Sequence, residues 1–164
     1  MEQLRKAFHN HLDDAKSELV RLAASVTELI PRATAVLLEG DLEGADYIIR
    51  GDDEIDARSV DLEEHCYQIL VLQSPVATDL RQVIAVLRMI AEVERSADLV
   101  CNICKAARRI YGHELDPKLR GIIGRMGDQA QQLFDAASRT SSLFASSRWL
   151  WNALRSCSIS RTGP

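Results

Sequence analysis

Apolar residues recur at steps of three and four along three long segments of this chain, and only short links separate the segments. The first segment ends at Gly40-Asp41, the second runs from about Glu43 to Gln73, and the third runs from about Pro75 to Tyr111. This spacing is typical of coiled-coil-like helices with one apolar face. Long helices joined by such short links must run antiparallel. The sequence therefore predicts an all-α fold, an antiparallel up-down-up three-helix bundle.

The apolar steps also predict the core. In the first helix they fall on Phe8, Leu12, Ala15, Leu19, Leu22, Val26, Leu29, Ala33 and Leu37. In the second they fall on Ala45, Ile48, Asp52, Ile55, Ser59, Leu62, Cys66, Ile69 and Gln73. In the third they fall on Val76, Leu80, Val83, Leu87, Ile90, Glu94, Ala97, Cys101 and Cys104. Because aromatic residues make up only 5% of the chain, aliphatic side chains must fill this core.

The links and the C-terminal part predict three regions. Ser74 is expected to cap the third helix, with Pro75 in its first turn. Residues 1–112 then form the three-helix unit, and residues 113–137 hold a fourth helix that begins near Asp116-Pro117. Its apolar positions are Leu119, Ile122, Met126, Ala130 and Leu133. Residues 138–164 are rich in serine and arginine and contain both tryptophans, which predicts an irregular tail.

Composition excludes several classes of protein. A net charge of −4 argues against a nucleic-acid-binding protein, which usually carries a basic stripe. No apolar run is long enough to span a membrane, and the charged N-terminus does not resemble a signal peptide. Four cysteines are too few for a disulfide framework. These features predict a cytoplasmic protein.

Two carboxylates occupy apolar positions of the predicted helices, Asp52 in the second and Glu94 in the third. A buried charge without a partner is costly, so such positions need protons, basic partners or a metal ion. In an antiparallel hairpin about Ser74-Pro75, residues whose numbers sum to about 149 lie side by side. Asp52 and Asp56 should therefore face Glu94 and Asp98, with both pairs spaced i, i+4.

These four carboxylates are the predicted metal ligands: Glu94, Asp98, Asp52 and Asp56. Oxygen ligands suit hard ions such as Mg²⁺, Ca²⁺, Mn²⁺ or Fe³⁺. The alternative is a metal-free acidic face that pairs with Arg50, Arg58 and Arg95, in a plain helical interaction domain. A ferritin-like di-iron site is disfavoured, because none of the four histidines follows an acidic residue at the required spacing.

The remaining residues with reactive side chains are expected to have no catalytic role. Cys101 and Cys104 form a lone CxxC inside a helix, where cysteine packs as a small apolar group. No phosphate-binding loop or nucleophile motif is present, so we expect a protein that is not an enzyme. In the tail, Trp149, Leu150 and Trp151 among arginines are compatible with contact to a membrane surface.

Three segments together resemble the PhoU family in order and spacing. They are Gly51-Asp-Asp-Glu-Ile-Asp56, Leu72-Gln-Ser-Pro-Val-Ala-Thr-Asp-Leu-Arg81 and Glu94-Arg-Ser-Ala-Asp98. The resemblance covers about residues 5–135. It implies an all-α fold of two similar three-helix repeats, of which this chain carries the first and one helix of the second. The Glu-x-x-x-Asp of Glu94 and Asp98 matches the metal motif of the family.

The resemblance also implies a function. The family is expected to restrain phosphate uptake and phosphate-starvation signalling, with the ATPase of a phosphate ABC transporter and a sensor histidine kinase as partners, often as a homodimer. It implies a bound metal, with Fe, Mn, Mg, Zn or Ni possible, at Glu94 and Asp98 with Asp52, Asp56 and Asp79 as neighbours. Asp79 lies near the hairpin turn, where a capping role is favoured.

Overall fold

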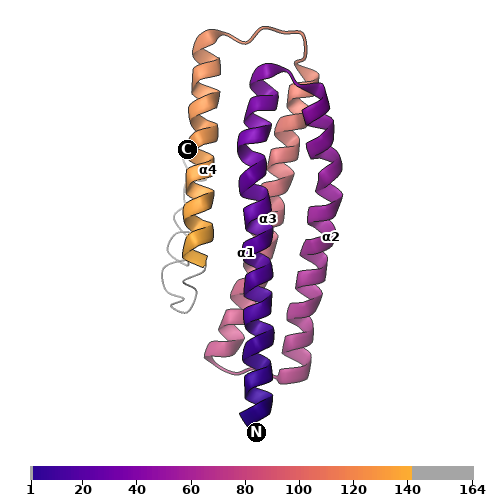
Figure 1. Ribbon diagram of the computed structural model, residues 1–164, viewed down its shortest axis with the longest axis vertical. Helices are drawn as coiled ribbons and strands as arrows, with labels where there is room; N and C mark the ends of the chain where they lie inside the picture. Colours follow the sequence, from indigo (N-terminus) through magenta and orange to yellow (C-terminus); the bar gives the residue numbers. More distant parts are fainter. Residues whose placement is uncertain (1, 142–164) are drawn as a thin grey trace, which may run out of the picture.

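The computed structural model describes residues 2–141, which form four helices and no strand (Figure 1). Helix α1 spans Glu2–Glu39, α2 spans Leu42–Gln73, α3 spans Thr78–Arg109 and α4 spans Pro117–Ser141. Successive helices run in opposite directions, and α1 contacts each of the other three. The predicted all-α, up-down-up bundle is confirmed. None of the four helices is long and apolar enough to cross a membrane.

Local chemistry fixes two of the three links. Gly40 has a φ of +72°, a conformation in which glycine lacks the strain of other residues, and it ends α1. Asp41 then caps α2, since its Oδ1 accepts a hydrogen bond from the Gly44 N–H at 3.0 Å. Asp116 caps α4 in the same way, accepting from the N–H groups of Lys118 and Leu119 at 2.9 and 3.2 Å.

The third link differs from the prediction. Ser74 ends α2 in the left-handed conformation (φ 43°, ψ 55°) and donates its N–H to the Leu70 carbonyl, so it does not cap α3. An N-cap residue is normally extended, so the left-handed Ser74 is not in the conformation that a helix starting at Pro75 would need. Helix α3 begins only at Thr78, after Ala77 at a φ of 51°. Val76 is consequently 74% exposed and lies outside the core.

The core otherwise follows most of the predicted positions, except that Leu80 is exposed and Leu29, Leu37 and Leu87 are half-buried. In α2, every predicted position except Asp52 and Gln73 is buried. In α3 the buried stripe is wider than predicted. The additional buried residues of α3 are Val86, Val93, Val100 and Ala107.

Helix α4 packs on α1 through residues other than its most apolar ones. Gly127 lies against Thr34, Gly124 lies near Leu38, and Phe134 packs against the core. The apolar positions predicted for this helix remain largely exposed, with Leu133 at 73%. The helix continues to Ser141, three residues beyond the predicted start of the tail. Residues 142–164, with the predicted membrane contact of Trp149, Leu150 and Trp151, lie outside the described residues.

Candidate carboxylate site

Contacts between α2 and α3 fix the register that positions the site. The Cys101 thiol donates to the Ile48 carbonyl oxygen at 3.8 Å, which agrees with the predicted pairing of residues whose numbers sum to about 149. Further along, the Arg108 guanidinium lies 3.0 Å from the Asp46 carboxylate. The predicted hairpin pairing is therefore correct through the middle of the bundle.

This register brings the four predicted residues together. Asp52 and Glu94 are partly buried between α2 and α3, whereas Asp56 and Asp98 are exposed beside them. Asp56 feels the negative charges of Asp52 and Asp98, and Glu94 feels those of Asp56, Asp98 and Asp52. The carboxylates are thus close enough to repel one another when all are ionised.

Two pKa values report this environment. The pKa of the Asp56 carboxyl is raised, first by partial desolvation and then by the charges of Asp52, Asp98 and Asp53. The pKa of Glu94 is raised in the same way, by desolvation and then by Asp56 and Asp98. Both shifts favour the protonated acids, and a bound cation would relieve the same repulsion.

The arginines proposed as alternative partners do not neutralise the site. Across residues 2–141, no salt bridge joins these carboxylates to Arg50, Arg58 or Arg95. Arg58 instead donates from Nη1 to the Ser25 hydroxyl at 3.3 Å, on the α1 side of α2. The cluster therefore keeps an uncompensated negative charge.

The carboxylate oxygens of these residues suit a hard cation, although they do not converge on one point. The inner oxygen of Asp52, Oδ1, is buried and has no hydrogen-bond partner of good geometry. Such an atom is costly unless something binds it. Yet within the described part of the chain no three Asp, Glu, His or Cys side chains converge closely enough to hold a metal ion as they stand. Metal binding here requires side-chain rotation.

One acidic residue was not predicted. Glu63 also contributes to the raised pKa of Glu94, from a position two turns along α2 from Asp56. Its i, i+7 spacing from Asp56 is the signal that would have identified it. Asp79, by contrast, lies in the first turn of α3 and does not contribute to either raised pKa. The structure shows no side-chain cap at the start of α3, so the capping role expected for Asp79 is not found.

The cysteines behave as core residues. Cys66, Cys101 and Cys104 are buried free thiols. Desolvation raises the pKa of Cys101 to about 12, with the Asp52 carboxylate as a further cause, and raises the pKa of Cys66 and Cys104 to about 11. Thiols this hard to ionise are poor nucleophiles and poor metal ligands.

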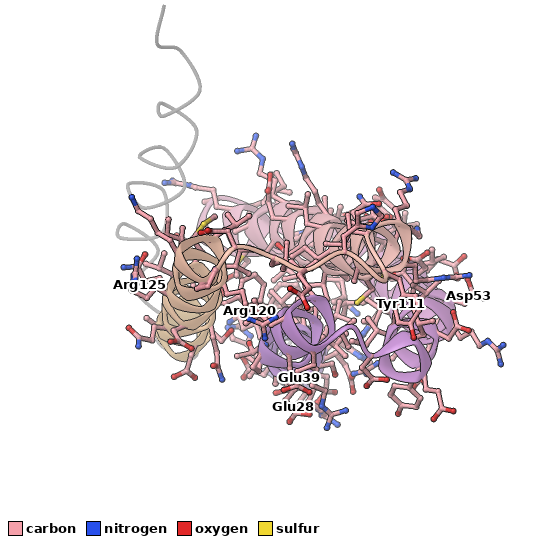
Figure 2. All side chains as sticks on the ribbon, turned by 90° about the horizontal axis from the view of Figure 1, so that it is seen from above. Glu28, Glu39, Asp53, Tyr111, Arg120 and Arg125 are labelled. Carbon is pink, nitrogen blue, oxygen red and sulfur yellow. The ribbon has the colours of Figure 1, made fainter. Side chains whose placement is uncertain are left out.

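Cavities lie away from the carboxylates. One of about 270 Å³ lies between α1 and α2, beside Arg58, Asp61 and His65. Another lies where the α3–α4 link crosses the end of α1, beside Tyr111 and Arg120. Figure 2 looks down on this end and shows Asp53 on the side of the bundle away from α4. The carboxylate site is therefore a surface site that α4 does not cover.

Neutralising the site is expected to stabilise the metal-free protein. Because Asp56 and Glu94 have raised pKa values, the folded chain binds more protons than the unfolded chain just above pH 4. These two groups therefore lower the free energy of unfolding as the pH rises through that window. The double change Asp56→Asn, Glu94→Gln should raise Tm in EDTA at pH 7 by about 1–2 °C, a small value because both groups are partly exposed. The gain should vanish near pH 4. A lower Tm at pH 7 would contradict it.

Known proteins resemble this chain over the region that holds the site. Residues 19–107 match the PhoU domain family. The phosphate-specific transport system accessory protein PhoU homolog 2 of Mycobacterium bovis is 32% identical over 135 residues, covering 82% of this chain and 63% of that protein. The Aquifex aeolicus homolog is 34% identical over 96 residues, covering 58% of this chain and 43% of its own length.

A further relative is less similar in sequence. The accessory protein PhoU of Serratia marcescens is 27% identical over 128 residues, covering 78% of this chain and 53% of that protein. The chain spans less than two thirds of the length of these relatives. No solved structure gives a significant match.

Proposed function

Because this chain belongs to the PhoU family, we propose that it is an accessory regulator that restrains phosphate uptake and phosphate-starvation signalling. The observation that carries the proposal is the family match over residues 19–107, which contains all four carboxylates of the site. These relatives are named as accessory proteins of phosphate transport systems, which supports a role beside a transporter rather than a catalytic one.

A regulator of this kind acts through protein contacts. The proposed partners are the ATPase of a phosphate ABC transporter and a sensor histidine kinase, both reached from the cytoplasm. We further propose that residues 1–112 form one repeat and that α4 begins a second. The exposed apolar positions of α4 support this, since they suit further helices or a second copy of the chain. A homodimer is part of the proposal.

The carboxylates are proposed to bind a metal ion. Asp52 and Asp56 from α2, with Glu94 and Asp98 from α3, would supply oxygen ligands, and Asp52 Oδ1 is buried without a hydrogen-bond partner of good geometry. Iron, manganese or magnesium suits such a donor set best, while zinc and nickel are weaker candidates. The ion would neutralise the repulsion between the two helices and so fix their outer surface. The Cys101–Ile48 and Arg108–Asp46 contacts hold the two helices in register without the ion.

The functional test is phosphate uptake in cells that lack this gene. Expression of the chain in the deletion strain is expected to lower ³³P-phosphate uptake in phosphate-replete medium, together with expression of a phosphate-starvation reporter. An empty vector is the control. Unchanged uptake and reporter signal, at verified protein levels, would rule out the regulatory role.

The metal test uses the purified chain. Protein treated with EDTA and dialysed against Mn²⁺ or Fe²⁺ should retain metal by elemental analysis, and Glu94→Gln, Asp98→Asn should reduce the retained amount at least fivefold. Asp128→Asn, an exposed carboxylate on α4, is the matched control and should retain the wild-type amount. Equal metal in all three proteins would exclude the site and favour the metal-free adaptor.

A further inference from the structure

The carboxylates continue into two apolar stripes that the proposed metal site does not explain. Along α3, one stripe advances from the hairpin turn in steps of four and three and changes from apolar to acidic; it contains Leu80, Ile84, Leu87, Ala91, Glu94 and Asp98. The matching stripe of α2 contains Leu70, Tyr67, Glu63, Val60, Asp56 and Asp53. Such spacing places each set along one side of its helix.

The two stripes lie side by side. Glu94 of α3 interacts electrostatically with Asp56 and Glu63 of α2, so the acidic parts are neighbours. The same antiparallel register places Tyr67 near the level of Ile84 and Val60 near the level of Ala91. Leu70 and Leu87 pack against the core below and form the base of this surface.

The upper side chains of this surface are open to solvent. Val60 and Tyr67 are 54% and 52% exposed, and Leu80 and Ile84 are both more than a third exposed. We define the α2–α3 face as these four apolar residues with their acidic neighbours; the latter are Asp53, Asp56, Glu63, Glu94 and Asp98. Helix α4 packs on α1 and leaves this face uncovered.

We propose that the α2–α3 face binds an amphipathic helix of a partner protein, with aliphatic side chains over Val60, Tyr67 and Ile84 and lysine or arginine at one end over the carboxylates. This inference rests on the proposed function, since it names the surface by which the regulator contacts a partner. A surface that combines exposed apolar residues with carboxylates that concentrate toward one end is complementary to a helix with an apolar stripe and one basic end.

Charge selects this occupant over two others. No salt bridge neutralises Asp56, Glu94 or Asp98 within residues 2–141. One divalent ion would offset only part of the charge of the ionised carboxylates, so a basic side chain would meet a negative field with or without the ion. An anionic bilayer would be repelled by the same field. A second copy of the chain would bring two acidic clusters into one interface or leave them uncompensated.

The test uses two synthetic 18-residue helical peptides with the same leucine stripe. One carries three lysines at one end, and the other carries three glutamates there. Binding of each labelled peptide to the full chain is measured by fluorescence anisotropy in EDTA, so that no metal competes for the carboxylates. The basic peptide is expected to bind at least tenfold more tightly than the acidic one, which corresponds to about 1.4 kcal/mol.

Surface variants then locate the binding site. Val60→Ser, Tyr67→Ser should weaken binding of the basic peptide at least tenfold. The matched control Tyr47→Ser, Leu133→Ser removes an aromatic and an aliphatic residue that are 69% and 73% exposed but lie elsewhere, on the other flank of α2 and on α4. It should change the affinity less than twofold. Circular dichroism confirms that each variant folds.

Three results would overturn the docking proposal. They are equal affinity for the two peptides, an equal loss in the control variant, and binding of the chain to phosphatidylserine vesicles that the same face variant abolishes. These failures are distinct from failure of the proposed function. Normal repression of phosphate uptake by the Val60→Ser, Tyr67→Ser variant would likewise overturn the docking site while leaving the regulatory role intact.

Discussion

Replacing Ile90 with alanine is expected to lower the free energy of unfolding by about 3–4 kcal/mol. Ile90 is fully buried in the middle of α3, inside the larger core cluster formed with α1 and α2. Removing three carbon atoms there loses hydrophobic burial and leaves a cavity that three long helices cannot close without shifting. Urea unfolding followed by circular dichroism measures the change, and the midpoint should fall without a change in slope.

The matched control lies six residues away on the same helix. Ile84 is 39% exposed, so Ile84→Ala should cost less than about 1 kcal/mol. Similar losses in the two variants would mean that α3 is not packed between α1 and α2 as the structure places it. Ile84 is also part of the α2–α3 face, so the Ile84→Ala variant should bind the basic peptide more weakly while keeping its fold.

Replacing Gly127 with alanine should destabilise the protein, although alanine is the better helix former. A Cβ at this position would lie 2.7 Å from Thr34 Cγ2 and 3.0 Å from Thr34 Cβ, with Oγ1 closer still. A hydrogen bond from Thr34 Oγ1 to the Ile30 carbonyl at 2.9 Å holds that side chain in place. Relief requires α4 to move away from α1, at a net cost of about 1–2 kcal/mol.

The same chemical change in the same helix should have the opposite sign at Gly121. There the nearest atom to a Cβ is the flexible end of Arg125, at 3.7 Å, so Gly121→Ala should stabilise by about 0.5–1 kcal/mol. Thermal unfolding of both variants tests the contrast. Adding Thr34→Ala should recover part of the loss caused by Gly127→Ala; no recovery would show that Thr34 is not the obstacle.

The fold could be predicted largely because apolar spacing is a direct record of which helix face is buried. The second helix shows this best, since its predicted positions from Ala45 to Ile69 are all buried except Asp52. The third helix shows the limit. The three- and four-residue steps chosen there omit Val86, Val93 and Val100, which are buried beside the predicted positions.

The turn and the fourth helix could not be predicted for different reasons. Ser74 and Pro75 are a favourable pair for starting a helix. The chain instead reverses direction at this point, with Ser74 and Ala77 at positive φ. In α4, the most apolar stripe is not the one that packs on α1. Glycine permits close approach there, and a pattern based on hydrophobicity cannot register a contact made through Gly127.

The grouping of the site residues followed from register alone, because an antiparallel hairpin fixes which numbers meet. Asp52, Asp56, Glu94 and Asp98 lie together as predicted. Their rotamers could not be predicted, since these depend on what the carboxylates bind, and in the metal-free arrangement no three converge. Glu63 was not predicted because it lies one heptad beyond Asp56, outside the segment that resembles the family motif.

Helix α1 contacts every other helix, and this has a consequence for how the chain is made. On the ribosome, α1 is complete long before α3, whose last residue is number 109. At roughly 5–20 residues per second, the 70 positions that separate the ends of α1 and α3 take about 4–14 s to synthesise. Until α3 is made, only α2 can shield Leu22 and Val26, which are buried in the finished bundle. The apolar face of α1 is therefore incompletely covered in the nascent chain for several seconds before the bundle can close.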